Sequence, residues 1–315
     1  MEALYASGRW GEPPPYQSLS FPAGERSKTR ETWLRLTDAL LDRGFGRDSG
    51  LIALGGGVTG HLAGFVAATY MRGVPYLQVP TTLVAMADAS VGGKTGVDTP
   101  AGKNLVGAFH PPAAVLADPV VLGTLPDAVF REGLAETVKH GLIADLDYFE
   151  WMERHIPEIG RRDPEALTHL VRRSVEIKAA VVEEDEREQG RRAILNAGHT
   201  VAHALERESR YELTHGPAVA LGLLAECQIA EDLDIAAPGL RQRVARLLAD
   251  LGLPTRSTRG FDAAAVMAAM HQDKKNRDGE TRMALPLTIG EMHHTGGWTT
   301  PVRDDVIGAA LAVLR

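Results

Sequence analysis

The side chains with the clearest chemical potential are a glutamate, a lysine and three histidines in the second half of the chain. Glu136 and Lys139 lie three positions apart, so they share one face of a predicted helix. His199 and His203 share one face of a later helix, and His215 precedes another. A glutamate and two histidines can bind Zn²⁺ and leave a fourth position open to substrate. Spacing alone nominates both His199 and His203 as ligands.

The alternative for each histidine is an ordinary surface or core residue, and for any single one of the eleven this alternative is favoured. Two histidines on one helical face beside Asn196 move the balance towards metal binding or catalysis. The segment His199–His203 has no glutamate after its first histidine, so it is not the zinc-protease motif.

A glycine-rich segment in the first half, Gly55–Gly60, has the pattern G-x-G-x-x-G between a predicted strand and a predicted helix. Glycine lets the backbone approach a pyrophosphate, and the helix N-terminus supplies N–H donors. The acidic residue that usually follows about 20 positions later is missing, since the first acid is Asp88. The segment favours a nucleotide-binding loop over a bare turn, but not a standard Rossmann site.

Two lysines are flanked by glycine, Lys94 in GGKTG and Lys103 in GKN. Lysine beside glycine suits phosphate binding, with backbone N–H groups assisting. A pair of solvated loop lysines is an equal alternative. Arg72 ends a predicted helix, where its charge complements the helix dipole. An ATPase phosphate loop is excluded, because its first glycine would fall at Asp88.

The first half of the chain alternates short apolar runs with helical patterns, and these elements must position the side chains above. Apolar runs that stop at glycine are typical of buried parallel strands. The predicted strands are Leu51–Leu54, Tyr76–Val79 and Ala114–Ala117, with helices at Val58–Met71 and Thr82–Ser90. This alternation predicts a parallel sheet with right-handed crossovers.

The second half is dominated by helix formers, which predicts two domains. Residues 1–126 form an α/β domain, and residues 127–315 form a mainly helical domain. A strand is predicted at Met283–Ile289. The predicted helices of the second domain are Asp127–Ile143, Leu146–Arg154, Pro164–Glu188, Arg192–Arg207, Pro217–Asp232, Gly239–Leu251, Phe261–His271 and Val302–Leu314.

Composition excludes several classes of protein. With 34 Lys and Arg against 41 Asp and Glu, the net charge is −7, so the chain is no general nucleic-acid binder. The single cysteine, Cys227, cannot form an internal disulfide, which indicates a reducing compartment, the cytoplasm. No secretory signal is apparent at the N-terminus. The apolar segment Leu51–Met71 is interrupted by Gly55, Gly56, Gly57 and Gly60, so a membrane span is not expected.

Several of these segments belong to an ordered series of motifs. The series is Gly55–Val74, Pro80–Val84, Asp88–Asp98, Gly102–Leu105, Leu134–Ala144, Asp185–Arg207, Thr214–Pro217 and Asp273–Arg277. In this order the motifs resemble the 3-dehydroquinate synthase family over about residues 21–289. More loosely, they are similar to other sugar-phosphate cyclases and to the metal-dependent polyol dehydrogenases of the same fold, such as glycerol dehydrogenase.

The resemblance implies a Rossmann-like N-terminal domain that binds NAD and a helical C-terminal domain that holds Zn²⁺ or Co²⁺. Glu136, His199 and His215 correspond to the metal ligands, whereas His203 corresponds to a histidine that contacts substrate and is no longer a ligand candidate. Other substrate positions are Asp88, Lys94, Lys139, Lys178, Arg192, Asn196, Lys274 and Arg72, the last reaching from the second subunit of a homodimer. The cofactor positions are Glu25, Lys28, Gly56, Gly57, Val58, His61, Thr81, Thr82, Lys103, Thr124 and Leu125.

The implied reaction converts 3-deoxy-D-arabino-heptulosonate 7-phosphate to 3-dehydroquinate and phosphate, in the shikimate pathway of aromatic amino-acid biosynthesis. NAD oxidises the C5 hydroxyl while the metal polarises its oxygen. Phosphate leaves, NADH returns the hydride, the ring opens, and an intramolecular aldol reaction closes the carbocycle. The alternatives are another sugar-phosphate cyclase and a catalytically weak relative with a scaffold or regulatory role. The complete set of charged site residues speaks against the weak relative.

Three features depart from the family pattern. His61 replaces an aspartate that contacts the cofactor, and Pro217 replaces a glutamate. Proline is well tolerated in the first turn of a helix, so the metal site is expected to survive. About fifty residues precede the glycine loop, and the family's first strand is expected to be absent. His61 and the missing strand are both expected to lower NAD affinity.

Overall fold

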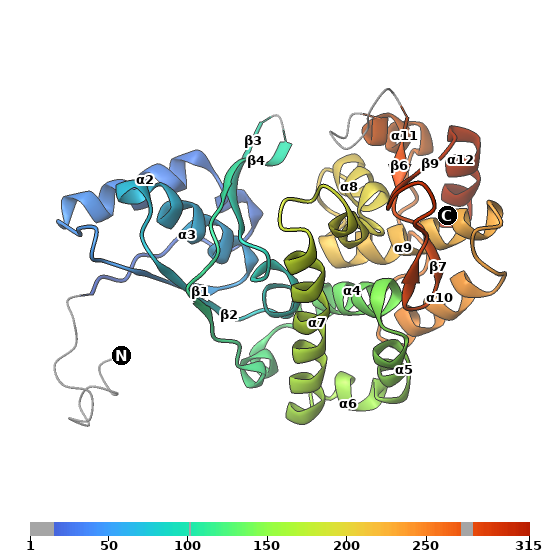
Figure 1. Ribbon diagram of the computed structural model, residues 1–315, viewed down its shortest axis with the longest axis horizontal. Helices are drawn as coiled ribbons and strands as arrows, with labels where there is room; N and C mark the ends of the chain where they lie inside the picture. Colours follow the sequence, from blue (N-terminus) through green and yellow to red (C-terminus); the bar gives the residue numbers. More distant parts are fainter. Residues whose placement is uncertain (1–15, 101, 272–279) are drawn as a thin grey trace.

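The computed structural model describes residues 16–100, 102–271 and 280–315, which build two hydrophobic cores. The smaller core gathers buried side chains between Leu36 and Val97, and the larger one between Leu83 and Leu314. The first half of the chain and the helical second half lie side by side along the long axis (Figure 1). No helix within the described ranges combines the length and the apolar character needed to cross a membrane.

A parallel sheet lies at the centre of the first half, in the strand order β1-β2-β5. Its strands are β1 (Leu51–Gly55), β2 (Tyr76–Pro80) and β5 (Ala114–Val115). The helix α3 (Gly57–Thr69) follows β1 and buries Leu62, Val66 and Ala67 against the sheet. The helix α2 (Arg30–Asp42), which the sequence patterns did not predict, packs on α3. The predicted alternation of strands and helices is thus present.

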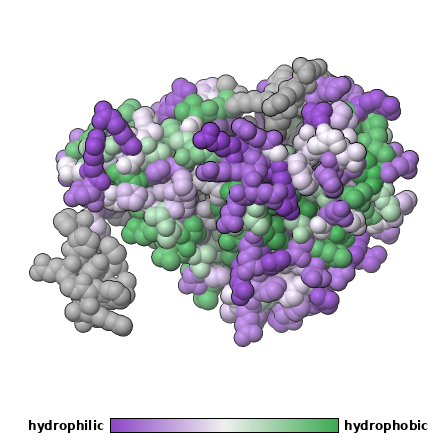
Figure 2. Space-filling view, viewed as in Figure 1, coloured by the Kyte–Doolittle hydropathy of each residue, from purple (hydrophilic) through white to green (hydrophobic). Residues whose placement is uncertain are grey.

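The opposite face of this sheet is open. Ile52 and Leu54 are 59% and 65% exposed, whereas Ala53 between them is buried towards α3. Leu116, directly after β5, and Val120 add further exposed apolar area. Figure 2 shows apolar side chains gathered over β1 and β2. Parallel sheets are usually covered on both faces, so an uncovered apolar face is unusual.

The segment containing Lys94 and Lys103 is an antiparallel hairpin, which corrects its interpretation as loops. The strand β3 (Lys94–Thr99) pairs with β4 (Gly102–Phe109). A Cβ added at Gly107 would lie 2.1 Å from the Thr95 carbonyl oxygen. The glycines that suggested loops therefore allow the two strands to approach closely.

Two long buried helices organise the second half, α4 (Asp127–Ala144) and α9 (His215–Asp232). The remaining helices surround them. They are α5 (Leu146–Arg154), α6 (Ile156–Gly160), α7 (Pro164–Glu184), α8 (His199–Glu208), α10 (Leu240–Asp250), α11 (Ala263–His271) and α12 (Asp304–Ala312). Two short antiparallel strand pairs lie between α11 and α12. The strand β6 (Arg282–Met283) pairs with β9 (Thr300–Pro301), and β7 (Pro286–Thr288) pairs with β8 (Glu291–Met292).

Several predicted elements differ from the structure. The helix predicted over 192–207 is broken into the 3₁₀ segment η5 (Arg191–Asn196) and α8, because Gly198 has a left-handed conformation with φ 79°. The helix predicted over 164–188 ends at Glu184, and the strand predicted over 283–289 is divided between β6 and β7.

The segment after β2 ties the two halves of the chain together. The helix predicted over 82–90 is present in shortened form, mainly as the π-helix η3 (Ala85–Ala89). Leu83, Met86 and Ala87 are fully buried in the larger core. This anchoring carries Asp88, from the first half of the chain, against the helices of the second half.

Candidate active site

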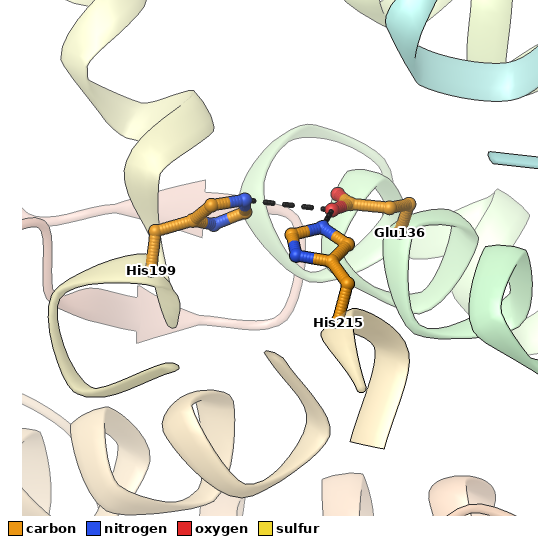
Figure 3. A group of neighbouring side chains, drawn as sticks. All are labelled: Glu136, His199 and His215. Carbon is orange, nitrogen blue, oxygen red and sulfur yellow. Dashed lines mark hydrogen bonds and ion pairs between the residues drawn. The ribbon is translucent and has the colours of Figure 1, made fainter. Parts of the chain in front are cut away.

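Three helices bring a carboxylate and two imidazoles together. Glu136 lies in α4, His199 begins α8 and His215 begins α9. Glu136 Oε1 is 2.8 Å from His215 Nε2 and 3.4 Å from His199 Nε2. The three side chains point towards one another (Figure 3), with one potential ligand atom from each within 4.8 Å of the others. His203 is not in this group: it is exposed, and its ring centroid is 5.4 Å from that of His199.

Close helix packing places His215 beside Glu136. A Cβ added at Gly216 would lie 2.5 Å from the Glu132 Cα, one helical turn before Glu136. The Gly216 N–H donates to the Glu132 carboxylate at 2.5 Å. Pro217 lies in the first turn of α9, where helical N–H groups have no intrahelical acceptor, so its missing donor costs no helical hydrogen bond. The departure at Pro217 leaves this geometry intact.

The donor set suits a divalent cation. One carboxylate oxygen and two imidazole nitrogens match the three protein ligands of a catalytic zinc site. Burial disfavours the Glu136 anion, but Lys139 and His199 outweigh it and hold the pKa of Glu136 well below its usual range. Burial and Lys139 lower the pKa of His199 to about 4, which keeps its ring neutral for ligation. Against its burial, Glu136 and Glu206 raise the pKa of His215 to about 10.

A second charged group adjoins the first and centres on Asp88. Asp88 Oδ1 lies 2.8 Å from Lys178 Nζ and 3.7 Å from Lys139 Nζ. Burial raises the pKa of Asp88, but these two ammonium groups outweigh it and bring it well below the usual range. Burial lowers the pKa of Lys178, whereas Glu136 and Asp88 raise that of Lys139 despite burial. The group therefore carries closely spaced opposite charges beside the candidate metal site.

Lys94 and Asn196 converge on one carboxylate, that of Glu188. The Lys94 ammonium pairs with Glu188, and the Asn196 side-chain amide donates to Glu188 Oε1 at 2.6 Å. Arg192 is buried nearby and donates to the carbonyl oxygens of Gly92 (3.1 Å) and Glu186. These contacts hold the glycine turn before Lys94 against the loop that precedes η5.

The glycine loop and the threonines after β2 form one backbone cradle. The Thr81 N–H donates to the Gly55 carbonyl at 2.9 Å. Gly56 is the N-cap of α3 and offers no side chain there, so the first N–H groups of α3 have no side-chain cap. A Cβ added at Gly56 would lie 3.1 Å from Thr82 Cγ2. Gly57 and Val58 are in the first turn. This uncapped helix start fits the phosphates of a dinucleotide.

His61 in α3 accepts a hydrogen bond from a buried lysine. Lys28 Nζ donates to His61 Nδ1 at 3.0 Å and also to Asn104 Oδ1. Glu25 lies 3.6 Å from the same ammonium. Burial and the Lys28 charge lower the pKa of His61 to about 3, so the ring is neutral. Three of the expected cofactor residues, Glu25, Lys28 and His61, thus form one cluster.

Of the remaining expected site residues that the structure describes, Thr124, Leu125 and Arg72 form no hydrogen bond or ion pair with these clusters. Thr124 and Leu125 are at the end of the 3₁₀ segment η4 (Pro119–Thr124), where the Thr124 hydroxyl donates to the Val121 carbonyl. Arg72 is exposed, with φ 68°. Lys274 lies outside the described residues. Lys103 is 3.4 Å from a carboxylate oxygen of Glu206 in α8.

Sequence reasoning missed His140, Glu188 and Glu206. His140 is fully buried, with Nε2 3.5 Å from Asp88 Oδ1. Glu206 was detectable, because positions 199, 203 and 206 follow the spacing of one helical face. Glu188 lies in a stretch of six charged residues among seven, and nothing in that pattern singles it out.

Comparison with known proteins identifies relatives over nearly the whole chain. Residues 18–132 match the family model for the 3-dehydroquinate synthase N-terminal region, and residues 133–276 match the C-terminal one. A 3-dehydroquinate synthase of Halorhodospira halophila is 47% identical over 296 residues, which cover 94% of this chain and 83% of that protein. One of Idiomarina loihiensis is 47% identical over 269 residues, covering 85% and 75%.

Solved structures show the same fold. A 2-deoxy-scyllo-inosose synthase complexed with carbaglucose-6-phosphate, NAD⁺ and Co²⁺ aligns with a TM-score of 0.89 at 29% identity, covering 98% of this chain and 86% of that one. A 2-epi-5-epi-valiolone synthase from Streptomyces hygroscopicus subsp. jinggangensis with NAD⁺ and Zn²⁺ bound gives 0.85 at 32%, covering 93% and 81%. A probable glycerol dehydrogenase from Sinorhizobium meliloti shares the fold at 17% identity and a TM-score of 0.59, covering 93% and 82%.

The expected fold class, a Rossmann-like domain followed by a helical domain, is confirmed by these alignments. The family models match consecutive segments that together extend from residue 18 to residue 276. The chain therefore belongs to the 3-dehydroquinate synthase family.

Proposed function

We propose that this chain is a 3-dehydroquinate synthase, which converts 3-deoxy-D-arabino-heptulosonate 7-phosphate to 3-dehydroquinate and phosphate. Its cofactors are NAD and a divalent cation, Zn²⁺ or Co²⁺. Among the structural observations, the proposal rests on the convergence of Glu136, His199 and His215 directly beside the Asp88–Lys178 ion pair.

Glu136, His199 and His215 would hold the cation through one carboxylate oxygen and two imidazole nitrogens. When bound, NAD takes and returns a hydride, and the cation polarises the substrate oxygen at which charge develops. Lys139 neutralises the excess negative charge of Glu136, since its Nζ lies 2.5 Å from Glu136 Oε2. His203, exposed one turn after His199, lies outside the group of ligands and contacts substrate.

The cationic residues bind the substrate and its leaving phosphate. Lys94, Arg192 and Asn196 lie around the loop before η5, where their donors can surround an anionic group. Lys178 and Asp88 orient a polar part of the substrate between the two halves of the chain, with Lys274 as a further substrate contact. The contact of Lys94 and Asn196 with Glu188 supports this role, because a phosphate can replace that carboxylate as an acceptor.

The nucleotide site uses the uncapped start of α3 and the cluster around Lys28. Gly56, Gly57 and Val58 offer backbone N–H groups to the phosphates, and Thr81 and Thr82 border them. The remaining proposed contacts are Glu25, Lys28, His61, Lys103, Thr124 and Leu125. Calorimetric titration of NAD tests the role of His61: His61→Asp is expected to bind NAD more tightly than the parent protein, and equal affinities would refute it.

The direct test is phosphate release from the heptulosonate phosphate in the presence of NAD and Zn²⁺ or Co²⁺, with the product identified by NMR. Formation of 3-dehydroquinate is the expected result. Because the fold also matches 2-deoxy-scyllo-inosose synthase with a high TM-score, the second candidate function is that of another sugar-phosphate cyclase. Phosphate release from a hexose phosphate, without release from the heptulosonate phosphate, would favour that second reaction. No release from either substrate would indicate a relative without catalytic activity.

We also propose a cytoplasmic homodimer with domains at residues 1–126 and 127–315. The open apolar face that carries Ile52 and Leu54 supports association, because surfaces of this kind usually contact a partner. Arg72, exposed and with no ion pair to any described residue, supports a role outside its own subunit. Light scattering after gel filtration measures the oligomeric state.

A further inference from the structure

Glu206 is a buried carboxylate that none of the roles above uses. It lies in α8, two turns after His199, and only 4% of its side chain is exposed. Its Oε1 is 3.7 Å from His215 Nδ1 and 3.4 Å from Lys103 Nζ. A buried carboxylate needs such partners, because an unpaired charge in the interior is strongly disfavoured.

The His215 ring lies between two carboxylates. Its Nε2 is 2.8 Å from Glu136 Oε1, and its Nδ1 faces Glu206 on the other side. A neutral imidazole that ligates a cation through Nε2 must carry its proton on Nδ1. In this ring that proton faces Glu206, so the Glu206 carboxylate favours the tautomer and orientation that present Nε2 to the cation.

Lys103, in the first half of the chain, contacts the same Glu206 oxygen, Oε1. It belongs to β4 of the hairpin, and its ammonium also lies 4.6 Å from the centre of the Tyr211 ring. Glu206 therefore receives one contact from the metal-site histidine and one from the hairpin. A stronger electrostatic interaction between Lys103 and Glu206 weakens the interaction between Glu206 and His215.

We propose that Glu206 is the positioning residue for His215, and that Lys103 weakens this effect by competing for the same carboxylate oxygen. The affinity of the cation site thereby depends on a residue of the hairpin. This inference rests on the proposed role of His215 as a metal ligand. It adds to that role a link between the cation site and the nucleotide-binding half of the chain.

The test is Co²⁺ binding to the NAD-free full-length protein, followed by competition with a chelator and by the visible spectrum of the bound ion. Glu206→Gln keeps the size of the side chain and removes its charge. We expect it to weaken Co²⁺ binding about 10- to 100-fold, as is typical when the partner of a ligating histidine is lost. Glu206→Asp should recover part of the affinity. Glu208→Gln, on the same helix but hydrogen-bonded to the Asp262 N–H, is the matched control and should bind like the parent.

Lys103 supplies the second arm of the test. Lys103→Met should strengthen Co²⁺ binding several-fold in the parent protein and have no such effect when combined with Glu206→Gln. That loss of effect distinguishes competition for Glu206 from a general electrostatic influence of the lysine. Glu206→Gln with parental affinity, or an equal effect of Lys103→Met in both backgrounds, would overturn the inference.

Two further results separate this inference from the metal site on which it rests. Thermal unfolding of each metal-free variant shows whether the fold is retained, and Glu206→Asp and Lys103→Met report on the link even if Glu206→Gln unfolds. If His215→Ala binds Co²⁺ as tightly as the parent, the metal-site assignment and the role of Glu206 both fail. If only His215→Ala loses binding while Glu206→Gln keeps it, the metal site stands and the positioning role fails.

Discussion

Lys139 Nζ lies 2.5 Å from Glu136 Oε2, one turn along the same helix, and both side chains are almost fully buried. This pair sets the charge balance of the site. The proposed cation ligand Glu136 and the proposed substrate contact Lys139 are in this way held in fixed relation by a single helix. The sequence shows directly that Glu136 and Lys139 are three residues apart, but it does not show that both side chains are buried.

Removing the lysine charge should destabilise the protein. Lys139→Met leaves the buried Glu136 carboxylate without its ammonium partner, whereas Asp88 keeps Lys178 at 2.8 Å. Breaking a buried ion pair costs about 3–5 kcal/mol. We expect the loss to be smaller with saturating Zn²⁺, because the bound cation compensates Glu136 and stabilises the folded state. Urea unfolding followed by circular dichroism, with and without Zn²⁺, measures both values. An equal loss in both conditions would argue against cation binding at Glu136.

Close helix packing should matter for metal binding as much as the ligands do. Gly216→Ala forces a methyl group into the Glu132 backbone, where the added atom would lie 2.5 Å from Cα. The helix α9 must move, at a cost of about 1–3 kcal/mol, and His215 moves with it. We therefore expect weaker Zn²⁺ binding as well as lower stability.

Gly160→Ala is the control for this change. It also replaces a helical glycine, but no atom lies within 4 Å of the added Cβ. It should leave Zn²⁺ affinity unchanged and alter stability by no more than about 1 kcal/mol, in the favourable direction. If Gly216→Ala retains parental Zn²⁺ affinity, the position of His215 does not depend on this contact.

The sequence patterns predicted the helices that carry the candidate site, but they did not predict which side chains these helices bring together. Helical periodicity indicated α4, α8 and α9, the helices that carry Glu136, His199 and His215. Spacing nominated His203 together with His199, and it could not find His215, because the position of His215 depends on the contact at Gly216. At this glycine neighbouring helices approach too closely for a side chain. Only the resemblance to a family distinguished the two histidines.

The β3–β4 hairpin was missed for a related physical reason. A glycine-rich segment can be a loop, or it can be a pair of strands that approach closely. The strands β3 and β4 approach closely around Gly96 and Gly107, and the local sequence does not distinguish this case from a loop. The break at Gly198 was missed because the pattern of apolar residues continues through it. In each case a contact between distant segments, absent from any local pattern, decides the structure.

Acid should destabilise the protein in part through His61. Its pKa falls from the ordinary 6.5 to about 3 in the folded state, owing to burial and to Lys28. The unfolded chain therefore takes up this proton first as the pH falls, and stability is lost from about pH 6.5 downward. One proton corresponds to a slope of at most about 1.4 kcal/mol per pH unit.

The comparison variant is His61→Gln, whose amide oxygen can still accept from Lys28 and which does not titrate. Free energies of unfolding in urea at pH 7, 6 and 5 should fall less steeply for this variant than for the parent. The difference between the two curves removes the contribution of all other groups that titrate in this range. Parallel curves would mean that His61 takes up a proton equally well in the folded protein.

Arg72 should act on the active site of the second subunit. Arg72 is exposed and makes no ion pair to any described residue, so its guanidinium group can reach an anion bound outside its own subunit. If it contacts substrate across a homodimer interface, Arg72→Ala and Lys139→Met should each inactivate the enzyme on their own. A heterodimer of the two variants then contains one site with both defects and one site with neither.

Mixing the two inactive proteins under conditions that allow subunit exchange should therefore restore activity. At equal amounts half of the dimers are mixed, and each mixed dimer has one intact site out of two, so about a quarter of the parental activity is expected from random pairing. Mixing Arg72→Ala with additional Arg72→Ala is the control and should restore nothing. If the mixture of the two variants also stays inactive while light scattering shows exchanged dimers, Arg72 serves the site of its own subunit, because every site in the mixed dimer would then carry one defect.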